Sequence, residues 1–392
     1  MRVGIDACCW SNERGYGRFA RELLRAMAPL APGDEFVCFL DRWTRDRFFL
    51  ELPNVSVVCV DQAASPSRAA SARGFRSPSD MLRLSRAVHA EPLDVFFCPS
   101  VYTYFPLPLR LPAVITIHDA IAERYPKLTL PSARDRLFWR MKVRLAIWQA
   151  RLVLTVSEFS RRELAAVLGI PPGIIRVAGE APAPIYRPSE TAEQVRAVAR
   201  KVGVPDGARW FIYVGGFNPH KNVDSIVHAH GAAARRFRDT PLYLLLVGSA
   251  DRDVFHGDLG TIEAAIAEEG TGDLVKWTGF VADEDLRHLH TGALALAIPS
   301  QCEGYGLPAV EAAACGTPVV ATTASPLPEI LEGGGLFVPP GDVGALSAAF
   351  GALLEDEPRR RSMGRRAREQ TSRLSWSSSA EVTLQALREA AG

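Results

Sequence analysis

The stretch ALALAIPSQCEGYGLPAVEAAACGTPVVAT (residues 293–322) decides the fold, because it places a helix between two strands. The apolar run before Pro299 predicts a buried strand. A helix is expected to begin near Leu307, with a proline in its first turn, where a missing N–H group costs nothing. Gly316 ends this helix, and a second strand is predicted at 317–322. Such close strand–helix–strand succession is typical of a parallel sheet.

The same alternation extends over nearly the whole chain. Apolar strands are predicted at RVGID (2–6), EFVCFL (35–40), VSVVCV (55–60), VFFCPS (95–100), AVITIHD (113–119), RLVLTVS (151–157), WFIYVGG (210–216), PLYLLLVG (241–248) and LVKWTGF (274–280). The proline-rich passage 181–188 separates two groups of strands. A chain of 392 residues exceeds what one core usually organises. We therefore predict an α/β protein of two Rossmann-like, doubly wound parallel-sheet domains (1–185 and 186–370) that face each other across a cleft.

The composition excludes several classes of protein. The net charge is +1, so no global field attracts the chain to nucleic acid or membrane. The first residues lack the apolar core of a signal peptide, and no apolar run approaches the roughly 20 residues of a membrane span. The seven cysteines form no CxxC pair. We expect a cytoplasmic protein with reduced, mostly buried thiols and no disulfide framework.

Two segments are locally basic. Residues 64–90 begin as a Ser/Ala/Pro-rich loop that contains Arg73 and Arg76. Residues 134–151 predict a helix with arginines at four-residue spacing and an apolar side. Two interpretations of this helix stay open: a domain helix with a solvated basic face, or a surface for an anionic membrane or a lipid-linked acceptor. In the second case, 64–90 or 134–151 would provide peripheral contact with the inner face of the membrane.

The two carboxylates Glu303 and Glu311 flank the predicted helix start. Gly304 and Gly306 free the backbone there, and the N–H groups and dipole of a helix N-terminus favour an anion such as a diphosphate. One carboxylate could then address each end of an extended ligand, across its phosphates. The alternative is a plain loop charge followed by a residue on the helix surface.

A second glycine-rich turn lies in the same domain. In WFIYVGGFNPHKN (210–222), a strand runs into Gly215 and Gly216, and Lys221 stands near the next helix start. A lysine beside a glycine-rich strand end suits phosphate charge. By itself this signal is weak, but it occurs in the same domain as Glu303.

Several motifs resemble the retaining glycosyltransferases of family 4, which have the GT-B fold. The motifs are GGFNPHKN (215–222), TGFVADEDL (278–286) and EGYGLPAVEAAACGTPVVAT (303–322), which holds the family's Glu-x7-Glu signature, and in the first domain GIDACCW and ERGYGRFARELL (4–24), ITIHDA (115–120) and TVSEFSRREL (155–164). The resemblance covers essentially the whole chain. It implies that the C-terminal segment 371–392 is a helix that crosses back to the first domain, where Trp376 would suit the packing.

The resemblance also implies roles for individual residues. Lys221 would hold the donor diphosphate, Glu303 would lie beside the donor sugar, and Glu311 would accept from the ribose hydroxyls. Backbone groups at Gly216 and around Tyr305, Gly306 and Leu307 would line the phosphates, and Phe280 and Val281 would meet the nucleobase. In the first domain, Gly15, Gly17 and Arg18 would form an acceptor or phosphate loop, and His118 would face the transferred sugar. Many members carry an arginine where this chain has Phe217, so we expect His220 or Arg18 to supply the second cation.

Other motifs are expected to have no role in the chemistry. Asp251-Arg252-Asp253 could hold a divalent metal in other transferases, but here it reads as a polar loop. The pairs His228/His230 and His288/His290 fall in predicted helices, where residues two apart diverge. We therefore expect neither a metal nor a cofactor. Ser157 is expected to cap the helix that follows it, and a direct substrate contact from 157–160 stays an alternative.

The leading prediction is a retaining, metal-independent hexosyltransferase. The donor would be GDP-mannose, a UDP-hexose or a dTDP-hexose, and the sequence around His118 and Ser157 favours mannose. The acceptor would be a glycan, a lipid-linked molecule or a small molecule, as in surface-polysaccharide synthesis. The resemblance implies that the loop 64–90, with Arg73 and Arg76, faces this acceptor. Two alternatives are a nucleotide-sugar 2-epimerase and a non-catalytic partner that binds sugar nucleotides.

Overall fold

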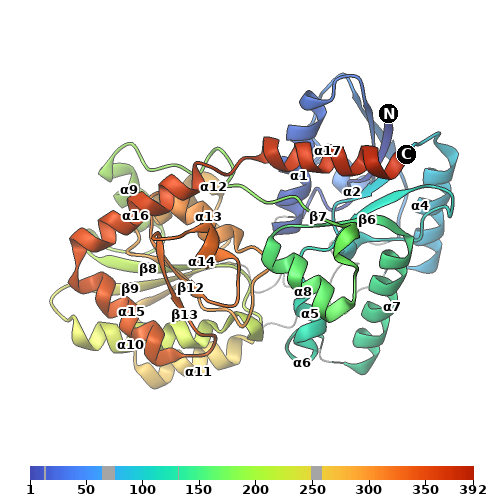
Figure 1. Cartoon of the computed structure of the whole chain (residues 1–392). Coiled ribbons are helices and arrows are strands. Elements are labelled where there is room, and N and C mark those ends of the chain that lie inside the picture. Colours follow the sequence, from blue (N-terminus) through green and yellow to red (C-terminus); the bar gives the residue numbers. More distant parts are fainter. Residues whose placement is uncertain (13–14, 64–75, 131, 249–257) are drawn as a thin grey trace. The chain divides into compact units, whose positions relative to one another are not determined.

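The structure is a computed structural model that describes residues 1–12, 15–63, 76–130, 132–248 and 258–392. The chain forms two compact units (Figure 1). Unit 1 contains Met1–Glu180 together with Ser375–Gly392, and unit 2 contains Ala181–Leu374. The proline-rich passage that follows Glu180 thus begins unit 2.

Unit 1 contains a parallel sheet of seven described strands in the order β3-β2-β1-β4-β5-β6-β7. Its strands are β1 (Arg2–Asp6), β2 (Glu35–Leu40), β3 (Val55–Cys59), β4 (Val95–Cys98), β5 (Ala113–Thr116), β6 (Ala150–Thr155) and β7 (Ile175–Val177). Its helices are α1 (Gly15–Leu30), α2 (Arg42–Arg45), α4 (Pro78–Ala90), η1 (Val101–Thr103), α5 (Ile121–Arg124), α6 (Pro126–Thr129), α7 (Ala133–Gln149), α8 (Glu158–Leu168), η2 (Pro172–Ile174) and α17 (Trp376–Ala391). The strand order reverses between β1 and β4, and ligands of such sheets bind beyond the strand ends at this point.

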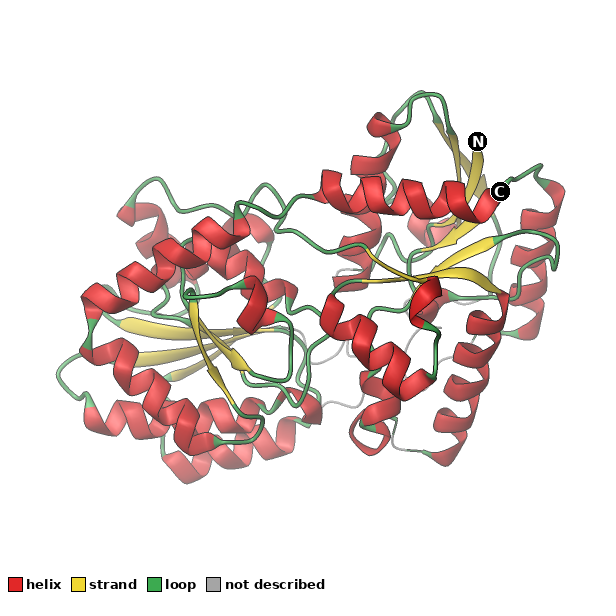
Figure 2. Cartoon of the chain, viewed as in Figure 1, coloured by secondary structure: helices red, strands yellow, loops and turns green. Residues whose placement is uncertain are grey.

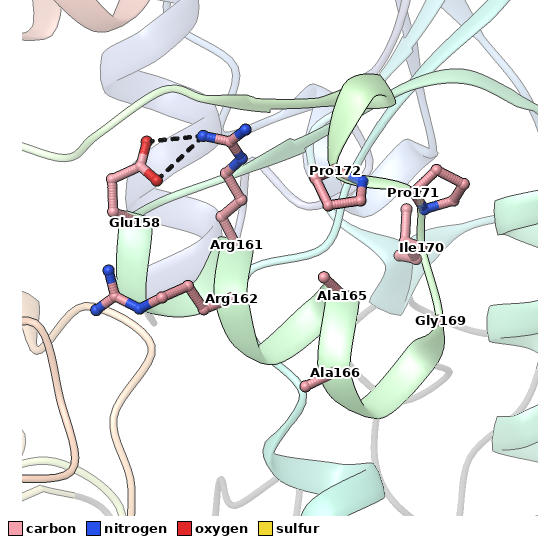
Figure 3. A pocket seen from close by; sticks show the side chains of 9 residues that line it. All are labelled: Glu158, Arg161, Arg162, Ala165, Ala166, Gly169, Ile170, Pro171 and Pro172. Carbon is pink, nitrogen blue, oxygen red and sulfur yellow. Dashed lines mark hydrogen bonds and ion pairs between the residues drawn. The ribbon is translucent and has the colours of Figure 1, made fainter.

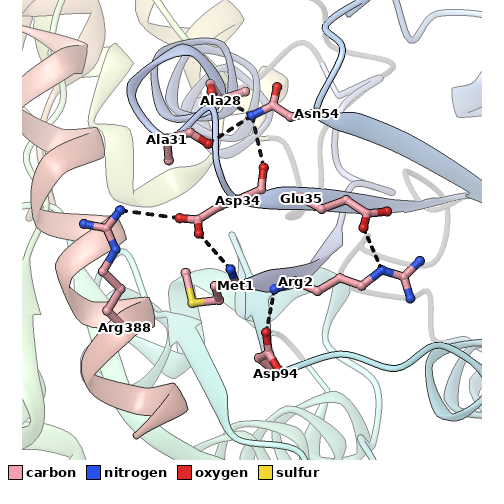
Figure 4. A network of polar contacts seen from close by, with 9 residues as sticks. All are labelled: Met1, Arg2, Ala28, Ala31, Asp34, Glu35, Asn54, Asp94 and Arg388. Carbon is pink, nitrogen blue, oxygen red and sulfur yellow. Dashed lines mark hydrogen bonds and ion pairs between the residues drawn. The ribbon is translucent and has the colours of Figure 1, made fainter.

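The C-terminal helix α17 belongs to unit 1 although it follows unit 2 in the sequence. It packs on α1, and the ring of Trp376 lies 6.1 Å from that of Phe19. Arg388 of α17 pairs with Asp34 at 3.4 Å, within a polar network around the first strand (Figure 4). Figure 2 shows α17 above β6 and β7 and α7 below them, so helices cover both faces of this part of the sheet.

Unit 2 contains a parallel sheet of six described strands in the order β10-β9-β8-β11-β12-β13. Its strands are β8 (Arg209–Val214), β9 (Leu242–Val247), β10 (Val275–Gly279), β11 (Leu296–Ile298), β12 (Val319–Thr322) and β13 (Gly335–Val338). Its helices are α9 (Ala192–Lys201), η3 (Pro219–Lys221), α10 (Val223–Arg236), α11 (Leu259–Glu269), α12 (Asp283–Gly292), α13 (Leu307–Ala314), α14 (Leu327–Ile330), α15 (Val343–Glu355) and α16 (Glu357–Thr371). The order reverses between β8 and β11, so the loops after these two strands meet at one edge.

The predicted pair of doubly wound parallel sheets is confirmed. Each predicted strand overlaps an observed one, and the edge strands β7 and β13 were missed. The prediction that the thiols are mostly buried is confirmed, because Cys59 alone of the seven cysteines is exposed. No helix in the described part of the chain is both long and apolar enough to cross a bilayer.

The prediction for the basic loop 64–90 is wrong at Arg76. Residues 64–75, including Arg73, lie outside the described residues, and residues 78–90 form α4 instead of a loop. Arg76 is buried, with its guanidinium 5.6 Å from the ring centre of Phe105. A buried arginine next to an aromatic core residue supports packing, so Arg76 is not a surface contact for an acceptor.

Candidate active site

A lysine and a glutamate meet where the sheet order of unit 2 reverses. Lys221 ends η3 after β8, and Glu303 lies in the loop after β11. Lys221 Nζ donates to Glu303 Oε1 at 2.7 Å, and the Ser300 hydroxyl donates to the same oxygen at 2.5 Å. The Glu303 side chain is nearly buried, whereas Lys221 keeps about a fifth of its side-chain surface. Sequence reasoning selected both ends of this pair but not Ser300.

Hydrogen bonds between the two loops hold this pair in register. Asn222 donates from Nδ2 to the Pro299 carbonyl at 3.0 Å. Gln301 donates from Nε2 to Asn222 Oδ1 at 3.2 Å and from its backbone N–H to the His220 carbonyl at 2.8 Å. Asn222 adopts a left-handed backbone (φ 51°), which asparagine tolerates better than most residues. Asn222 and Gln301 are positioning residues that the sequence analysis missed, although an asparagine directly before a helix is a recognisable signal.

Helix α13 begins next to Glu303. Its N-cap is Gly306, which has a φ of 89° and offers no side-chain cap. A Cβ atom at Gly306 would lie 2.8 Å from Leu327 Cδ1, so both the backbone and the space require glycine. The start of an eight-residue helix is therefore formed by backbone groups alone, which is the arrangement that suits an anion.

Glu311 lies inside α13 and is 4% exposed. Glu303 is similarly buried, at 6%. The alternative of a loop charge and a residue on the helix surface is therefore wrong, because burying a carboxylate requires partners that surface charges do not need. Tyr305 and Leu307 are buried between the two glutamates.

The other predicted donor residues lie in the loops that follow β8 and β10. Gly216 is half-buried after β8, and its carbonyl accepts a hydrogen bond from the Tyr213 hydroxyl. Phe280 and Val281 follow β10, which β9 separates from β8, and Phe280 is exposed. These residues share the carboxyl edge of the sheet with Lys221.

His220 does not supply a second cation. The imidazole is buried, and burial together with the adjacent Lys221 lowers the pKa of His220 to about 3. The ring is therefore neutral near neutral pH. The sequence shows that this histidine is next to a lysine, but it does not show that the ring points into the protein. The role of Arg18, half-buried in the first turn of α1, stays a prediction.

In unit 1, His118 follows β5 and is held by contacts on both ring nitrogens. Nε2 lies 3.0 Å from the Pro99 carbonyl, and because a carbonyl can only accept, Nε2 carries a proton. Nδ1 lies 3.7 Å from Glu180 Oε1. The Phe19 ring meets the imidazole edge-on, with centroids 4.9 Å apart. This arrangement fixes the ring and leaves Nδ1 as the nitrogen that can address a ligand.

Glu180 is a further candidate that sequence reasoning missed. Its side chain is buried after β7, the edge strand that the sequence pattern did not reveal. Its carboxylate faces His118 Nδ1. Glu180 is therefore a positioning residue for His118.

The glycines at the start of α1 differ in what surrounds them. A Cβ atom at Gly17 would lie 2.0 Å from the Asn12 carbonyl oxygen, whereas no atom of the described residues lies within 4 Å of one at Gly15. Only Gly17 is thus required by the close approach of the backbone that precedes α1.

A row of aromatic rings lies near these residues in unit 1. Tyr16 stacks on Tyr102 with ring centroids 5.2 Å apart, and Tyr102 lies 5.0 Å from Trp139. The Trp139 indole donates to Glu123 Oε1 at 2.7 Å. Burial raises the pKa of Glu123 to about 7, and burial lowers the pKa of Lys142, which lies over the Trp139 ring, to about 8. Sequence analysis had no signal for this cluster, because its members are far apart in the chain.

The motifs expected to have no role are placed as follows. Asp251-Arg252-Asp253 lies outside the described residues. His228 contacts Glu269, and His230 contacts the Leu242 carbonyl. His288 contacts the Ser189 hydroxyl, while His290 is buried near Tyr186. The two members of each pair thus contact different groups.

A groove of about 730 Å³ runs along α8 in unit 1 (Figure 3). It is lined by Glu158, Arg161, Arg162, Ala165, Ala166, Gly169, Ile170, Pro171 and Pro172. Arg161 pairs with Glu158 at 3.2 Å across one end of this groove. Ser157 accepts from the Ser160 N–H at 2.9 Å, which confirms the predicted cap of α8.

Comparison with known proteins identifies the class to which this chain belongs. Residues 195–370 match the family model for glycosyl transferases group 1, and residues 14–179 match that for glycosyltransferase family 4. The O-antigen chain mannosyltransferase B of Escherichia coli is 31% identical over 286 residues, which are 72% of each chain. The D-inositol 3-phosphate glycosyltransferase of Kineococcus radiotolerans is 32% identical over 256 residues, 60% of this chain and 56% of that protein.

A solved structure with the same fold is that of sucrose-phosphate synthase from Thermosynechococcus elongatus. It has a TM-score of 0.75 at 20% identity and covers 99% of this chain and 98% of its own. The protein belongs to the family 4 (group 1) glycosyltransferases and has the GT-B fold. The predicted fold, family and enzyme class are confirmed.

Proposed function

We propose that this glycosyltransferase moves a hexose from a nucleoside-diphosphate sugar to a hydroxyl group of a glycan, a lipid-linked molecule or a small molecule. The observation that carries the proposal is the contact between Lys221 and Glu303 beside the uncapped start of α13. A cation, a carboxylate and backbone N–H groups at one sheet edge suit a ligand that has both a diphosphate and a sugar.

On the donor side, the diphosphate binds Lys221 and the backbone at Tyr305, Gly306 and Leu307. Glu303 accepts a hydrogen bond from Lys221. When the diphosphate takes over this lysine, the Glu303 carboxylate becomes available to the sugar hydroxyls. Glu311 accepts from the ribose hydroxyls, and the backbone at Phe280 and Val281 meets the base.

On the sugar side, His118 contacts the transferred hexose through Nδ1, because Nε2 donates to Pro99. The bond from the anomeric carbon to the diphosphate oxygen breaks, and a bond to the acceptor oxygen forms on the same face of the sugar. The acceptor proton leaves with the nucleoside diphosphate. We assign His118 to hydrogen bonding with the sugar and not to proton abstraction.

Leaving-group stabilisation by Lys221 and the helix start supports a reaction without a metal. Fixed charges and dipoles aimed at developing negative charge are usually the largest catalytic term. The similarity to the E. coli mannosyltransferase supports a mannose donor. We therefore infer GDP-mannose ahead of UDP-hexoses and dTDP-hexoses.

A thermal-shift panel with GDP, UDP, dTDP, ADP and CDP, all in EDTA, tests the donor side first. A ligand that binds the folded state raises its melting temperature. We expect a shift with GDP, and incubation with GDP-mannose and candidate acceptors should then yield an α-linked product by NMR.

Other results would change the assignment. A melting-temperature shift with another nucleotide alone would assign the donor to that nucleotide instead of GDP. A shift that needs magnesium or manganese would overturn metal independence. Formation of an epimer from free donor would indicate a 2-epimerase. Nucleotide binding without turnover of any donor would indicate a non-catalytic partner.

A further inference from the structure

The outer face of α7 in unit 1 is apolar. Five of its side chains are between 38% and 68% exposed, and we call them the α7 strip: Leu137, Phe138, Met141, Leu145 and Trp148. On the opposite side of the helix, Val143 and Ala146 are buried against the unit. At 100° per residue, all five strip residues fall within one third of the helix surface. The helix therefore presents five large apolar side chains to the outside.

Three polar groups of α7 make contacts within the protein instead. Lys142 Nζ donates to the Tyr102 carbonyl at 3.2 Å, and the Trp139 indole donates to Glu123. The Arg136 guanidinium donates to the Leu130 carbonyl at 3.0 Å. An ordinary surface helix has the reverse arrangement. The apolar side that the sequence pattern marked is therefore exposed, together with three of the arginines, and the choice between the two interpretations of this helix stays a prediction.

Positive charge borders the α7 strip. Arg134, Arg140 and Arg144 are exposed on the same outer side, and α7 contains five basic residues but Asp135 as its single acidic residue. The Arg134 guanidinium lies over the Phe138 ring at 5.5 Å. Long arginine side chains can extend past an apolar surface and hold their charge at its border.

We propose that the α7 strip docks on the surface of an anionic lipid bilayer. Leucine, phenylalanine and tryptophan on one side of a helix, bordered by arginines, match the apolar interior and the negatively charged headgroups of such a surface. A contiguous exposed apolar patch of this kind marks an interaction site. The charge selects an anionic surface over a neutral one.

This inference does not depend on the proposed transfer reaction, since membrane binding is measured without donor or acceptor. Where the proposed function also holds, docking through unit 1 brings the enzyme to acceptors that are anchored in the same bilayer. Lipid-linked acceptors then take precedence over small soluble ones.

Co-sedimentation of the full chain with vesicles tests the proposal. One vesicle is phosphatidylcholine alone, and the other is a mixture of phosphatidylcholine with anionic phosphatidylglycerol. We expect the wild type to bind the anionic vesicle. The double variants Phe138→Ser/Trp148→Ser and Arg140→Glu/Arg144→Glu should each bind it at least tenfold more weakly. Higher salt should also weaken the binding of the wild type to the anionic vesicle.

Matched controls remove equal apolar area or equal charge elsewhere. Phe49 and Leu109 are 77% and 79% exposed in unit 1 outside α7, so Phe49→Ser/Leu109→Ser should bind within twofold of the wild type. Arg359→Glu/Arg365→Glu on α16 makes the same charge change in unit 2 and should also leave binding within twofold. Melting temperatures show that each variant is folded.

Three results would overturn the proposal. The first is that the wild type shows no preference for the anionic vesicle. The second is that the control variants lose as much binding as the strip variants. The third is that light scattering reveals a dimer that Phe138→Ser/Trp148→Ser converts to a monomer, with vesicle binding unchanged. The last result would assign the α7 strip to a second copy of the chain.

Discussion

At the scale of single residues, the contact between Lys221 and Glu303 is the most specific feature of unit 2. Two charged groups at 2.7 Å, one of them nearly buried, are held by hydrogen bonds from neighbouring loops. The pair explains how one short sheet edge can serve a diphosphate and a sugar together. It also explains why the motif needs both a lysine after β8 and a glutamate after β11.

Removing the lysine should weaken nucleotide binding. A hydrogen bond to a charged group contributes about 1.5–3 kcal/mol, so Lys221→Ala should weaken binding of the cognate nucleoside diphosphate roughly 10- to 100-fold. Isothermal titration calorimetry measures the dissociation constant of the nucleoside diphosphate. Lys201→Ala is the matched control, since that lysine of unit 2 is exposed and pairs with Asp285. Equal affinities in both variants would remove Lys221 from the site.

Glu311→Ala and His118→Ala should affect different steps. Glu311 is assigned to the ribose, so its loss should weaken donor binding. His118 is assigned to the transferred sugar, so its loss should lower kcat by about 100-fold with the donor Kd within twofold. The reverse pattern in titration and steady-state kinetics would exchange these roles.

At the scale of elements, the start of α1 shows how a backbone contact restricts the sequence. Gly17 lies in the first turn of α1, where the Asn12 carbonyl approaches too closely for any Cβ atom. The obstacle is a backbone atom, so a rotamer change cannot relieve it. Of the two glycines in this motif, only Gly17 is required by the backbone that approaches it.

Gly17→Ala should destabilise unit 1 by about 1–3 kcal/mol, the usual cost of forcing extra atoms into a packed site. Gly15→Ala is a control two residues away, where a Cβ atom meets nothing within 4 Å in the described part of the chain. That variant should be neutral or slightly stabilising, because alanine lowers the entropy of the unfolded chain. Urea denaturation measures both, and equal stability of the two variants would contradict the assignment.

At the scale of the whole molecule, burial shifts the pKa values of titratable groups in both units. The shifted groups are histidines in unit 2 and carboxyls in unit 1, so acidification has opposite effects on the stability of the two units. In unit 2, burial lowers the pKa of His220 and of His290 to about 3. In unit 1, burial raises the pKa of Glu123 to about 7 and also raises the pKa of Asp6. The two units should therefore respond differently when the pH falls from 7 to 5.

Unit 2 should lose stability on acidification. An unfolded histidine takes up a proton below its usual pKa of 6.5, whereas His220 and His290 stay neutral in the folded state down to about pH 3. Their contribution is therefore complete above pH 6.5 and falls by about 1.4 kcal/mol per pH unit for each histidine below it. Hydrogen exchange of unit 2 amides at pH 7, 6 and 5 measures the slope. His290→Leu should remove about half of it, and an unchanged slope would show that other groups dominate.

Unit 1 should gain stability over the same range. The folded state binds a proton at Glu123 up to about pH 7, whereas the unfolded carboxyl releases it near 4.5. The stabilisation is complete below pH 4.5 and is lost as the pH rises through 7. Glu123→Gln keeps a neutral side chain at every pH and should make the stability of unit 1 less dependent on pH between 5 and 7. A steeper dependence in this variant would contradict the raised pKa of Glu123.

The sequence by itself determined the parallel sheets, most strand positions, and the residue types of the donor site. Apolar runs of strand length and glycines before helices act locally, so their consequences are visible in a window of ten to twenty residues. The stretch 293–322 shows this: its strand, loop, helix and strand were predicted in order. Glu303 and Glu311 were found because the spacing between them is itself the signal.

Only the tertiary structure decided which side chains meet and which side of a helix faces out. Gln301 and Asn222 were missed because their contacts join loops that are about eighty residues apart in the chain. His220 and Arg76 were assigned to ligands but are buried, since burial depends on elements that pack from elsewhere. The same reason applies to α7: its pattern showed an apolar side, but only the packing of Val143 and Ala146 shows that this side is turned away from the core.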